Sequence, residues 1–323
     1  MAGISTQTTS RLTRTDIWST QLKEFFQDEL IAATKYVDWL TEFPDGNTFH
    51  IPSTGQMQIM DYDEGQAIRY TGLATGDFTF QITEYKSGAT YITDKAKQDL
   101  YYASQLEAMF VPKIKRALAV DLETAILALP NTSQTAGSLN LINTAAHRFI
   151  ANGTSNVISP TDFAAARYSL RKSDVPMTNL VAIVDPSTEF TLSTLSNLTN
   201  ISYNPKWEGI VRDGMTSGIK FLMNIYGFDV YTSNYLPSGI TETNNGKTLT
   251  GTGVANYFFA NAGGDTSPWK GAIRQEPRVE SERNKDLQRD EYVVTERYGL
   301  GFYRPENMVT ILTNQTAATT NVG

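Results

Sequence analysis

The chain of 323 residues contains no cysteine and only two histidines, and these absences exclude whole classes of chemistry. Without cysteine it can form no disulfide bond, offer no thiolate to zinc and use no thiol nucleophile. His50 and His147 are far apart and have no Asp or Glu at a spacing typical of metal ligands, which favours structural or surface roles. We therefore expect no metal site and no cofactor.

Basic residues and long apolar runs are also scarce. The 27 Lys and Arg residues are outnumbered by 34 Asp and Glu residues, for a net charge of −7. This balance argues against a protein that coats nucleic acid electrostatically. No apolar run approaches the ~20 residues that span a bilayer, and residues 1–15 are polar. We expect neither a membrane segment nor a secretory signal.

Motifs of enzyme active sites are missing too. The chain has neither a phosphate-binding Gly-x4-Gly-Lys-Ser/Thr loop nor a Gly-x-Ser-x-Gly elbow. The stretch "GTGVAN" (251–256) resembles half a dinucleotide fingerprint but lacks the third glycine. The carboxylates of "DYDEG" (61–65) could suggest a calcium site or a glycosidase pair, but the polar tip of a hairpin explains them more simply. We predict a protein that is not an enzyme.

What the sequence does contain is a mixture of helix and strand patterns, so we predict an α+β fold. After the polar residues 1–15, Asp16 is a candidate N-cap for a helix over 17–40. A turn at 44–48 and a short strand at 49–51 follow.

Residues 56–93 predict a long two-stranded ribbon with a polar tip. Met57 and Ile59 begin one alternating pattern, and Phe78 and Phe80 begin the other. A two-stranded ribbon is marginally stable alone in water. We therefore expect it to be covered by a neighbouring subunit or, alternatively, by its own domain.

The strongest helical pattern runs from a cap at Thr93 or Asp94 to about Leu129. Pro112 predicts a kink within this helix or, alternatively, a junction between two shorter helices. Roughly 36 residues at 1.5 Å per residue give a spine of about 54 Å.

The second half of the chain predicts an α/β region and then closing strands. Residues 130–159 are a connector, Ser159 caps a helix with Pro160 at its first position, and "LVAIVDP" is a buried strand before a short helix. A hairpin turns near Tyr226–Gly227, residues 238–253 are a long flexible loop, and the tail after 313 is loose. Between Lys270 and Glu306, eight basic and eight acidic residues are interleaved, either on a solvated sheet face or at a contact between subunits.

Two stretches, "YGFDVYTSNYLP" (226–237) and "RYGLGFYRPE" (297–306), together with the order of elements, resemble the major capsid proteins of tailed double-stranded DNA bacteriophages, which have the HK97-type fold. The resemblance covers nearly the whole chain. It implies an N-terminal arm (1–55), an extended loop (56–93), a peripheral domain with the spine helix (94–155 and 266–323) and an axial domain (156–265).

The resemblance also implies a function. Copies would self-assemble as pentamers and hexamers into an icosahedral shell around double-stranded DNA, without sequence-specific DNA binding and without a membrane. Scaffolding and portal proteins would be separate, assembly would occur in the host bacterial cytoplasm, and the product would be the virion capsid. Certain relatives carry a Lys–Asn isopeptide bond between subunits, for which Lys86 and Asn307 are the candidates here.

Two alternatives stay open from sequence alone. A cellular encapsulating shell protein shares this fold. A surface adhesin or carbohydrate-binding protein would instead show sandwich strands throughout, against which the predicted spine helix argues.

The candidate site residues are charged residues that could pair between subunits. They lie at the predicted ribbon tip and in the closing strands: Asp63, Glu64, Arg69, Arg278, Glu280, Glu282 and Arg283.

Overall fold

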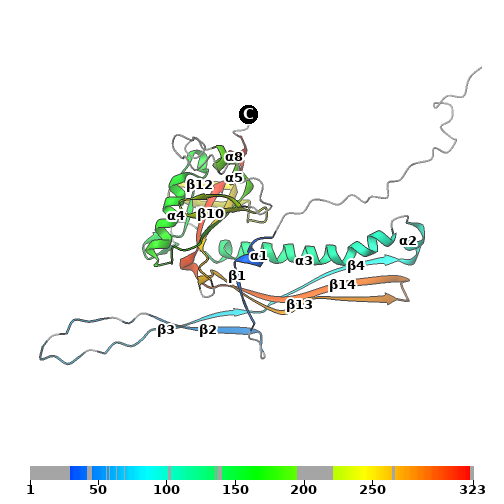
Figure 1. Ribbon diagram of the computed structural model, residues 1–323, viewed down its shortest axis with the longest axis horizontal. Coiled ribbons are helices and arrows are strands. Elements are labelled where there is room, and N and C mark those ends of the chain that lie inside the picture. The colour runs from blue at the N-terminus through cyan, green and yellow to red at the C-terminus, as the bar shows by residue number, and fades with distance from the viewer. Residues whose placement is uncertain are drawn as a thin grey trace, which may run out of the picture.

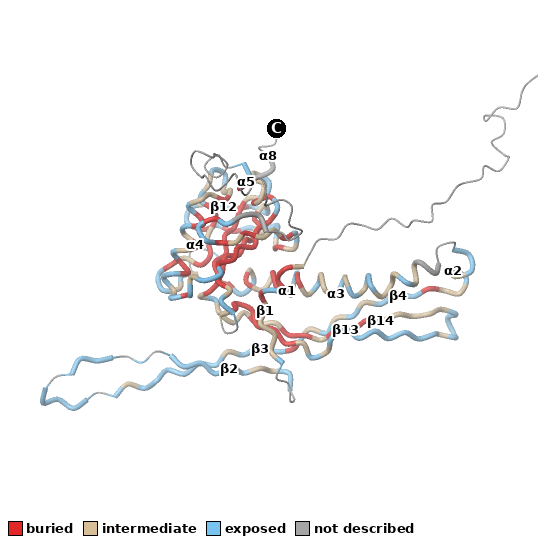
Figure 2. Tube along the Cα trace, viewed as in Figure 1, coloured by how far each residue is buried: buried red, intermediate tan, exposed pale blue. Residues whose placement is uncertain are grey.

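The structure, a computed structural model, describes residues 30–320 except 42–45, 56, 58, 63, 69, 101–102, 135, 137–139, 195–220 and 264–265. A rounded body carries two projections that point in opposite directions, a helix-and-sheet arm and a two-stranded ribbon (Figure 1). Buried residues are concentrated in the body and where the arm joins it (Figure 2). The predicted mixture of helices and strands is confirmed.

A seven-stranded sheet forms the body. Its order is β7-β15-β12-β8-β10-β9, with β11 also paired to β12. The strands are β7 (Arg148–Ile150), β8 (Leu180–Val184), β9 (Phe221–Ile225), β10 (Phe228–Thr232), β11 (Ile240–Asn244), β12 (Lys247–Ala260) and β15 (Val309–Asn314). All of β8 is buried, as predicted for "LVAIV", because both faces of the sheet are covered.

Alternate residues of β12 divide the core between the two faces of this sheet. Phe258 packs edge-on against Phe163 of α4 (Pro160–Lys172), with ring centroids 5.1 Å apart. Tyr257 points the other way and donates a 2.6 Å hydrogen bond to the carbonyl of Leu127. The predicted cap of α4 is confirmed, since Ser159 and Asp162 form a capping box. The short helix is α5 (Pro186–Thr194).

Both hairpins of the body turn through residues with positive φ. The predicted turn at Tyr226–Gly227 is confirmed, with φ of 52° and 88°. The prediction of a flexible loop at 238–253 is wrong, because β11 and β12 pair across Asn245–Gly246. These two residues have φ of 50° and 77°, the geometry of a type I′ turn, which Asn-Gly adopts readily.

The arm is a four-stranded sheet with a long helix on one face. Its order is β1-β13-β14-β4, from β1 (Val37–Leu40), β13 (Trp269–Asn284), β14 (Arg289–Phe302) and β4 (Glu84–Thr93). Helix α3 (Ala103–Ser133) lies along β14 and β4. Its 31 residues span about 46 Å. The predicted spine helix is therefore present.

The break in the spine is not where the sequence predicted it. Thr93 does cap a helix, because its hydroxyl accepts a 3.2 Å hydrogen bond from the Ala96 amide. That helix, α2 (Asp94–Asp99), ends at Leu100, whose backbone is extended. Helix α3 then continues through Pro112, so the predicted junction of two helices at this proline is wrong. Pro112 is exposed, on the side of the helix where bending is tolerated.

The first described residues correct the predicted helix over 17–40. Residues 17–29 lie outside the described part of the chain. The helix α1 contains only Ala32–Lys35, and Val37–Leu40 form strand β1 instead. β1 pairs in parallel with the start of β13, with Val37 opposite Trp269. A partner more than 200 residues away thus overrides the local helical pattern.

The ribbon exists but uses a different first strand. β2 (Thr48–Thr54) pairs with β3 (Thr75–Gln81), with Phe49 opposite Phe80. The prediction that a strand begins at Met57 is wrong, since Met57 and Ile59 lie in the loop between the strands. The rest of the predicted ribbon, β4, belongs to the arm sheet.

Short elements complete the described chain. The predicted connector contains β5 (Leu141–Ile142), β6 (Ala145–Ala146) and the 3₁₀ turn Thr154–Asn156. A second 3₁₀ turn, Pro305–Asn307, precedes β15, and the predicted loose tail forms helix α8 (Gln315–Thr320). In the described part of the chain, no helix has the length and apolar character needed to cross a bilayer.

Candidate assembly surfaces

The root of the ribbon is fixed to the arm sheet by aromatic packing. Phe49 stacks on Phe80 with centroids 5.2 Å apart, and Phe78 meets Tyr303 edge-on at 5.1 Å. A glycine in "RYGLGFYRPE" makes this contact possible, because a Cβ on Gly299 would lie 2.7 Å from the Gln81 carbonyl oxygen. That motif therefore has a packing role where the ribbon crosses β14.

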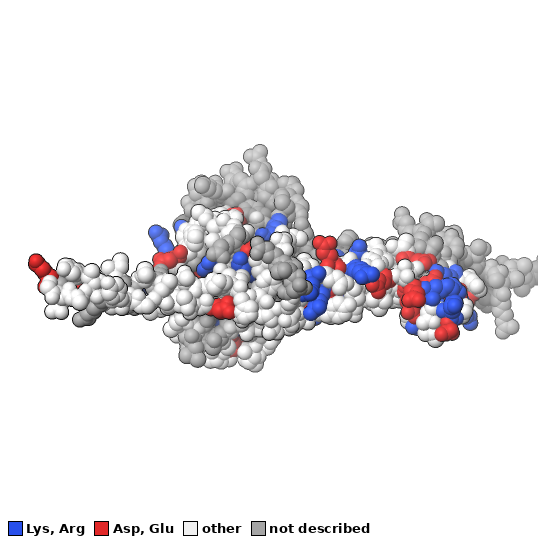
Figure 3. All heavy atoms as spheres, turned by 90° about the horizontal axis from the view of Figure 1, so that it is seen from below, with Lys and Arg blue, Asp and Glu red and all other residues white. Residues whose placement is uncertain are grey.

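The far end of the ribbon exposes large apolar side chains. Ile59 is 98% exposed and Tyr70 is 94% exposed. The exposed large apolar residues between the two ribbon strands are Met57, Ile59, Met60, Tyr62, Ile68, Tyr70 and Leu73. Figure 3 shows the ribbon as largely uncharged, with acidic atoms near its tip. A grouped apolar surface of this kind marks a contact with another molecule.

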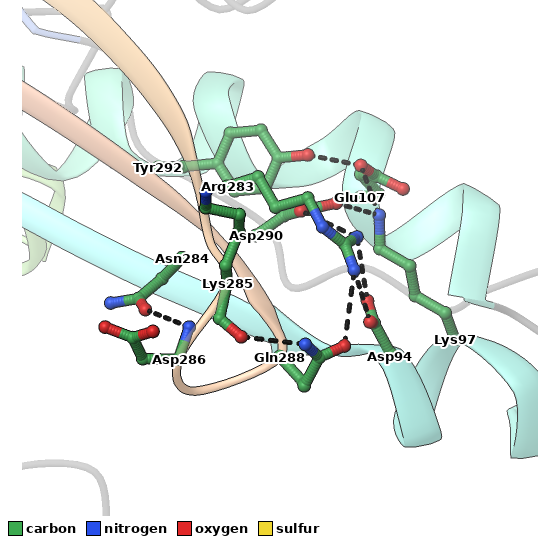
Figure 4. Close-up of polar contacts among 10 residues, drawn as sticks. All are labelled: Asp94, Lys97, Glu107, Arg283, Asn284, Lys285, Asp286, Gln288, Asp290 and Tyr292. Atoms are coloured by element: carbon green, nitrogen blue, oxygen red, sulfur yellow. Dashed lines mark hydrogen bonds and ion pairs between the residues drawn. The ribbon is translucent and has the colours of Figure 1, made fainter.

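At the opposite end, charged side chains join four elements in a network that we call the distal cluster (Figure 4). Its members are Asp94, Lys97, Glu107, Arg283, Asp290 and Tyr292. Lys97 of α2 donates to Asp290 of β14 at 2.5 Å and to Glu107 of α3 at 3.1 Å. Arg283 of β13 donates to both carboxylate oxygens of Asp94, at 3.2 and 2.7 Å. The hydroxyl of Tyr292 donates to Glu107.

These contacts shift the pKa values of Lys97, Asp290 and Glu107 so that the charged form of each side chain is favoured. The pKa of Lys97 is raised by its hydrogen bonds to Asp290 and Glu107. The pKa of Asp290 is lowered chiefly by Lys97, and that of Glu107 is lowered by Tyr292 and then by Lys97. Lys97, Glu107 and Asp290 therefore stay ionised across the neutral range, and the cluster ties the tip of the β13–β14 hairpin to α2 and α3.

The outer edge of the arm sheet is a second charged surface. β1 covers β13 only from Trp269 to Ala272, and no other described strand pairs with that edge farther along. Register shifts between Ile273 and Arg278, together with Pro277, interrupt the edge. Charges, proline and bulges are features that prevent uncontrolled strand pairing.

The structure separates the candidate site residues that the sequence grouped. Arg283 belongs to the distal cluster, and Glu64 is exposed at the ribbon tip. Arg278 and Glu280 are exposed on β13 and pair with each other at 3.2 Å. Glu282 is exposed on the same strand. Asp63 and Arg69 lie outside the described residues. Sequence reasoning missed Lys97, Glu107 and Asp290, because their proximity depends on the fold.

The cross-link candidates occupy different environments. Lys86 donates to Glu84 at 3.1 Å and lies 3.6 Å from Asp121. Asn307 is 2% exposed, accepts from the Ala260 amide and donates to the carbonyls of Ala260 and Thr266. Its carboxamide is therefore fully used in holding the chain beside the 3₁₀ turn.

The two histidines have the structural or surface roles that the sequence favoured. His147 is buried, with Nδ1 donating to the Ala145 carbonyl and Nε2 accepting from Ser173. Burial lowers its pKa. His50 is exposed on the ribbon and contacts Asp77 at 2.7 Å. No group of three or more metal-ligating side chains occurs within the described ranges.

Comparison with known proteins agrees with this architecture. The structure is similar to one from Mycobacterium phage Che8 (TM-score 0.67, 20% identity, 93% of this chain and 97% of that chain). It is also similar to the capsid structure of cyanophage P-SCSP1u (TM-score 0.68, 14% identity, 92% and 91%) and to the mature capsid of bacteriophage PhiM1 (TM-score 0.66, 10% identity, 93% and 91%). These similarities confirm the HK97-type fold. No curated protein sequence matches the chain.

The match of a family model decides between a phage capsid protein and the two alternatives that the sequence left open. A model described as phage capsid protein matches residues 77–311, which include most of the arm sheet, most of the body sheet and both motifs. A carbohydrate-binding sandwich does not contain a spine helix of this length, and the matched family favours a phage shell over a cellular one. The chain belongs to the phage capsid protein family and is a structural subunit of the virion capsid rather than an enzyme.

Proposed function

We propose that copies of this chain assemble as pentamers and hexamers into an icosahedral shell that encloses double-stranded DNA, and that each ribbon lies across a neighbouring copy. The exposed apolar loop between β2 and β3 carries this proposal. The ribbon extends away from its own body (Figure 1) and the apolar side chains of this loop are exposed, so their burial requires a second copy. Contacts of this kind can each be weak, because every subunit meets several neighbours.

The four-part division of the chain belongs to the same proposal. Residues 1–55 are the N-terminal arm, 56–93 the extended loop, 94–155 and 266–323 the peripheral domain, and 156–265 the axial domain at the centre of each ring. The strand pairing supports two adjustments. β7 and β15 pair within the body sheet, so we include them in the axial domain. β4 pairs with β14, which supports its inclusion in the peripheral domain.

Charged residues would then fix the register between neighbours. The exposed members of the predicted set, Glu64, Arg278, Glu280 and Glu282, are available for pairing between copies. Asp63 and Arg69 complete the proposed set at the ribbon tip. Arg283 pairs with Asp94, which supports a structural role for it within its own copy. A neighbouring copy would then contact the tip of the β13–β14 hairpin, which Arg283 holds in place.

The remaining partners follow from the same shell. A net charge of −7 suits a wall that encloses phosphate-rich DNA without gripping it by sequence. We propose that scaffolding and portal proteins are separate chains and that assembly occurs in the host bacterial cytoplasm.

Electron microscopy of the purified chain tests the proposal directly. We expect rings or closed shells from the natural chain, alone or with a scaffolding protein encoded beside it. In a matched variant, residues 56–73 are replaced by Asn-Gly. The Gly55 amide already donates a 2.7 Å hydrogen bond to the Ala74 carbonyl, so a two-residue turn can close the shortened hairpin. This variant should remain folded and monomeric. A natural chain that stays monomeric under all these conditions, or a shortened chain that still forms shells, contradicts the proposal.

A further inference from the structure

A cavity at the root of the ribbon is lined by two amide side chains whose polar atoms are not all satisfied by the described residues. It has a volume of about 420 Å³ and lies between β3, the end of α3 and the last residues of β14. Its apolar wall includes Phe80, Leu129 and Phe302. Its polar residues include Gln134, which is 6% exposed, and Asn140.

Two residues that line this cavity each have a solvent-inaccessible side-chain atom with no hydrogen-bond partner in the described part of the chain. Gln134 uses its amide nitrogen to donate to the Met308 carbonyl at 3.2 Å, but its Oε1 is buried without a hydrogen bond. The Nδ2 of Asn140 is likewise buried and unpaired. Each such group costs about 1–3 kcal/mol when it stays unsatisfied. Once these side-chain amides turn toward the cavity, a backbone peptide group offers the complementary N–H and C=O.

The lining also limits the chemistry of the occupant. None of the described residues that line the cavity carries a charge. An ionic ligand would lose its hydration without gaining a counter-charge. The occupant that fits is therefore an uncharged, extended peptide segment with an apolar side chain.

The chain itself contains such a segment. Residues 56–60, "QMQIM", are uncharged. Ile59 is 98% exposed and Met57 is 72% exposed. The described residues of this segment lie outside the β2–β3 ladder, which ends at Thr54. The other limb of the loop, 66–73, contains Arg69 and fits the uncharged lining less well.

The segment cannot reach the cavity of its own copy. The cavity is lined by Phe78 and Phe80 at the root of the ribbon, whereas Met57, Ile59 and Met60 lie beyond the opposite end of both strands. Seven consecutive residue pairs hold the ribbon straight between the two. We propose that residues 56–60 of one copy insert into this cavity of a neighbouring copy, with Ile59 as the apolar anchor. This inference rests on the proposed shell assembly and names the receiving site.

The absence of cysteine from the chain makes a disulfide test clean. Ile59→Cys is combined with Ser133→Cys, an exposed position on the cavity lining, and the assembled particles are oxidised. The expected result is loss of the monomer band and a ladder of multimers on a non-reducing denaturing gel. The matched control combines Ile59→Cys with Thr243→Cys, an exposed position on β11, and should keep its monomer band.

The outcomes separate this inference from the proposed function. A ladder in the first pair alone supports the inference. Particles without that ladder, or equal ladders in both pairs, overturn it while the proposed function stands. Failure of the natural chain to assemble counts against the proposed function itself. Should Ser133→Cys impair assembly, Thr79→Cys supplies a second exposed position on the same lining, with the same readings.

A charge test needs no cross-link. Ile59→Asp would carry a carboxylate into the uncharged cavity, so the assembled fraction should be lost. Gln66→Asp adds the same charge to an exposed position of the same loop and should assemble normally. Equal assembly of the two variants overturns the inference.

A substitution in the cavity gives a third test. Asn140→Leu should lower the denaturant concentration at which assembled particles dissociate, without lowering the melting temperature of the isolated subunit. Particles as resistant to denaturant as those of the natural chain would contradict the inference.

Discussion

At the scale of single residues, Glu123 shows how a buried charge can position a distant part of the chain. Its side chain is fully buried on α3. One carboxylate oxygen accepts from the amides of Ile31 and Ala32 at 2.9 and 2.8 Å, and the other accepts from Ala33 at 2.8 Å. Three backbone N–H groups replace water around the carboxylate. Glu123 thereby fixes the point at which the first described residues meet the spine.

The first prediction follows from this geometry. Glu123→Gln keeps the size of the side chain but turns one acceptor into an NH₂ group that faces a backbone N–H. We expect a loss of about 2–3 kcal/mol in the free energy of unfolding, measured by chemical denaturation. Glu276→Gln, at an exposed position on β13, is the control and should change little. Equal effects of the two substitutions would show that Glu123 contributes no more than a surface charge.

Residue types indicated some of these roles in advance and not others. The lack of ligand spacing around His147 correctly predicted a structural role, because that argument needs only the sequence. Glu123 gave no signal, since a glutamate in an amphipathic helix normally faces water. Its burial depends on amides about 90 residues away, which no local pattern specifies.

At the scale of elements, the distal cluster determines whether the hairpin tip stays on the spine. Lys97 contacts two carboxylates, and its removal leaves Glu107 and Asp290 without their shared cation. All these groups are partly exposed, so water screens the loss. We expect Lys97→Met to lower the melting temperature of the subunit by less than about 3 °C. Hydrogen exchange should rise locally at residues 284–290.

The control for this prediction is a lysine outside the cluster. Lys113→Met replaces an exposed lysine of α3 and should leave hydrogen exchange at the hairpin tip unchanged. Unchanged exchange in Lys97→Met as well would mean that backbone pairing alone holds the tip.

The contact between α3 and the arm sheet predicts a pH dependence. Glu296 of β14 is 6% exposed, and its Oε1 has no hydrogen-bond partner among the residues that the structure describes. Burial, and then the charge of Asp121 on α3, raises its pKa. Glu84 and Lys86 of β4 and Tyr298 of β14 are the other titratable groups around Asp121.

The sign of the effect follows from the raised pKa. The unfolded chain ionises Glu296 at a lower pH than the folded chain does. Its contribution to stability is therefore full below the ordinary glutamate pKa and is lost as the pH rises through the raised value. Glu296→Gln removes this loss, so the variant should gain stability relative to the natural chain as pH increases, until the gain levels off. Denaturant midpoints measured across the pH range give the comparison.

A neighbour on the same strand supplies a control of opposite sign. Arg289 and then Asn284 lower the pKa of Glu291. The stability that this shift gives is present above the ordinary glutamate pKa and is lost as the pH falls. Glu291→Gln should therefore lose stability relative to the natural chain at neutral pH and match it at acidic pH. Parallel profiles for the two variants would refute the assignment of Glu296.

Elements with a local signal were predictable, and those defined by distant partners were not. The capping box at Ser159 and the turn at Gly227 lie within a few residues of the structure that they specify. The Asn245–Gly246 turn carries the same kind of signal, but the polar residues around it favour the prediction of a loop. β1 had a helical pattern and became a strand because the edge of β13 was available to it.

At the scale of the whole molecule, the shape itself indicates assembly. Two projections in opposite directions leave a large surface for the size of the chain (Figure 1). The order of elements predicted this outline through the family resemblance. The pairing of candidate charges was beyond prediction, because contacts within one copy compete with contacts between copies. Arg278 and Glu280 show the problem, since each is the other's partner in a single chain.

Charge reversal at this pair can separate the two kinds of contact. The side chains of Arg278 and Glu280 are 70% and 58% exposed, so their mutual attraction contributes little to the stability of one subunit. Arg278→Glu and Glu280→Lys should each leave the melting temperature of the isolated subunit unchanged. If the residues pair with a neighbour, each should reduce the assembled fraction measured by sedimentation, more strongly at low salt than at high salt.

The double variant Arg278→Glu/Glu280→Lys decides between the two partners. It restores an ion pair within the strand but presents the opposite arrangement of charges to a neighbouring copy. Pairing between subunits predicts that assembly stays impaired in the double variant, because the neighbour still meets the wrong sign at each position. Recovery of normal shells would instead mean that the two residues serve only each other. The contact between copies would then depend on the apolar loop, whose exposed side chains supply attraction without any requirement for matching charges.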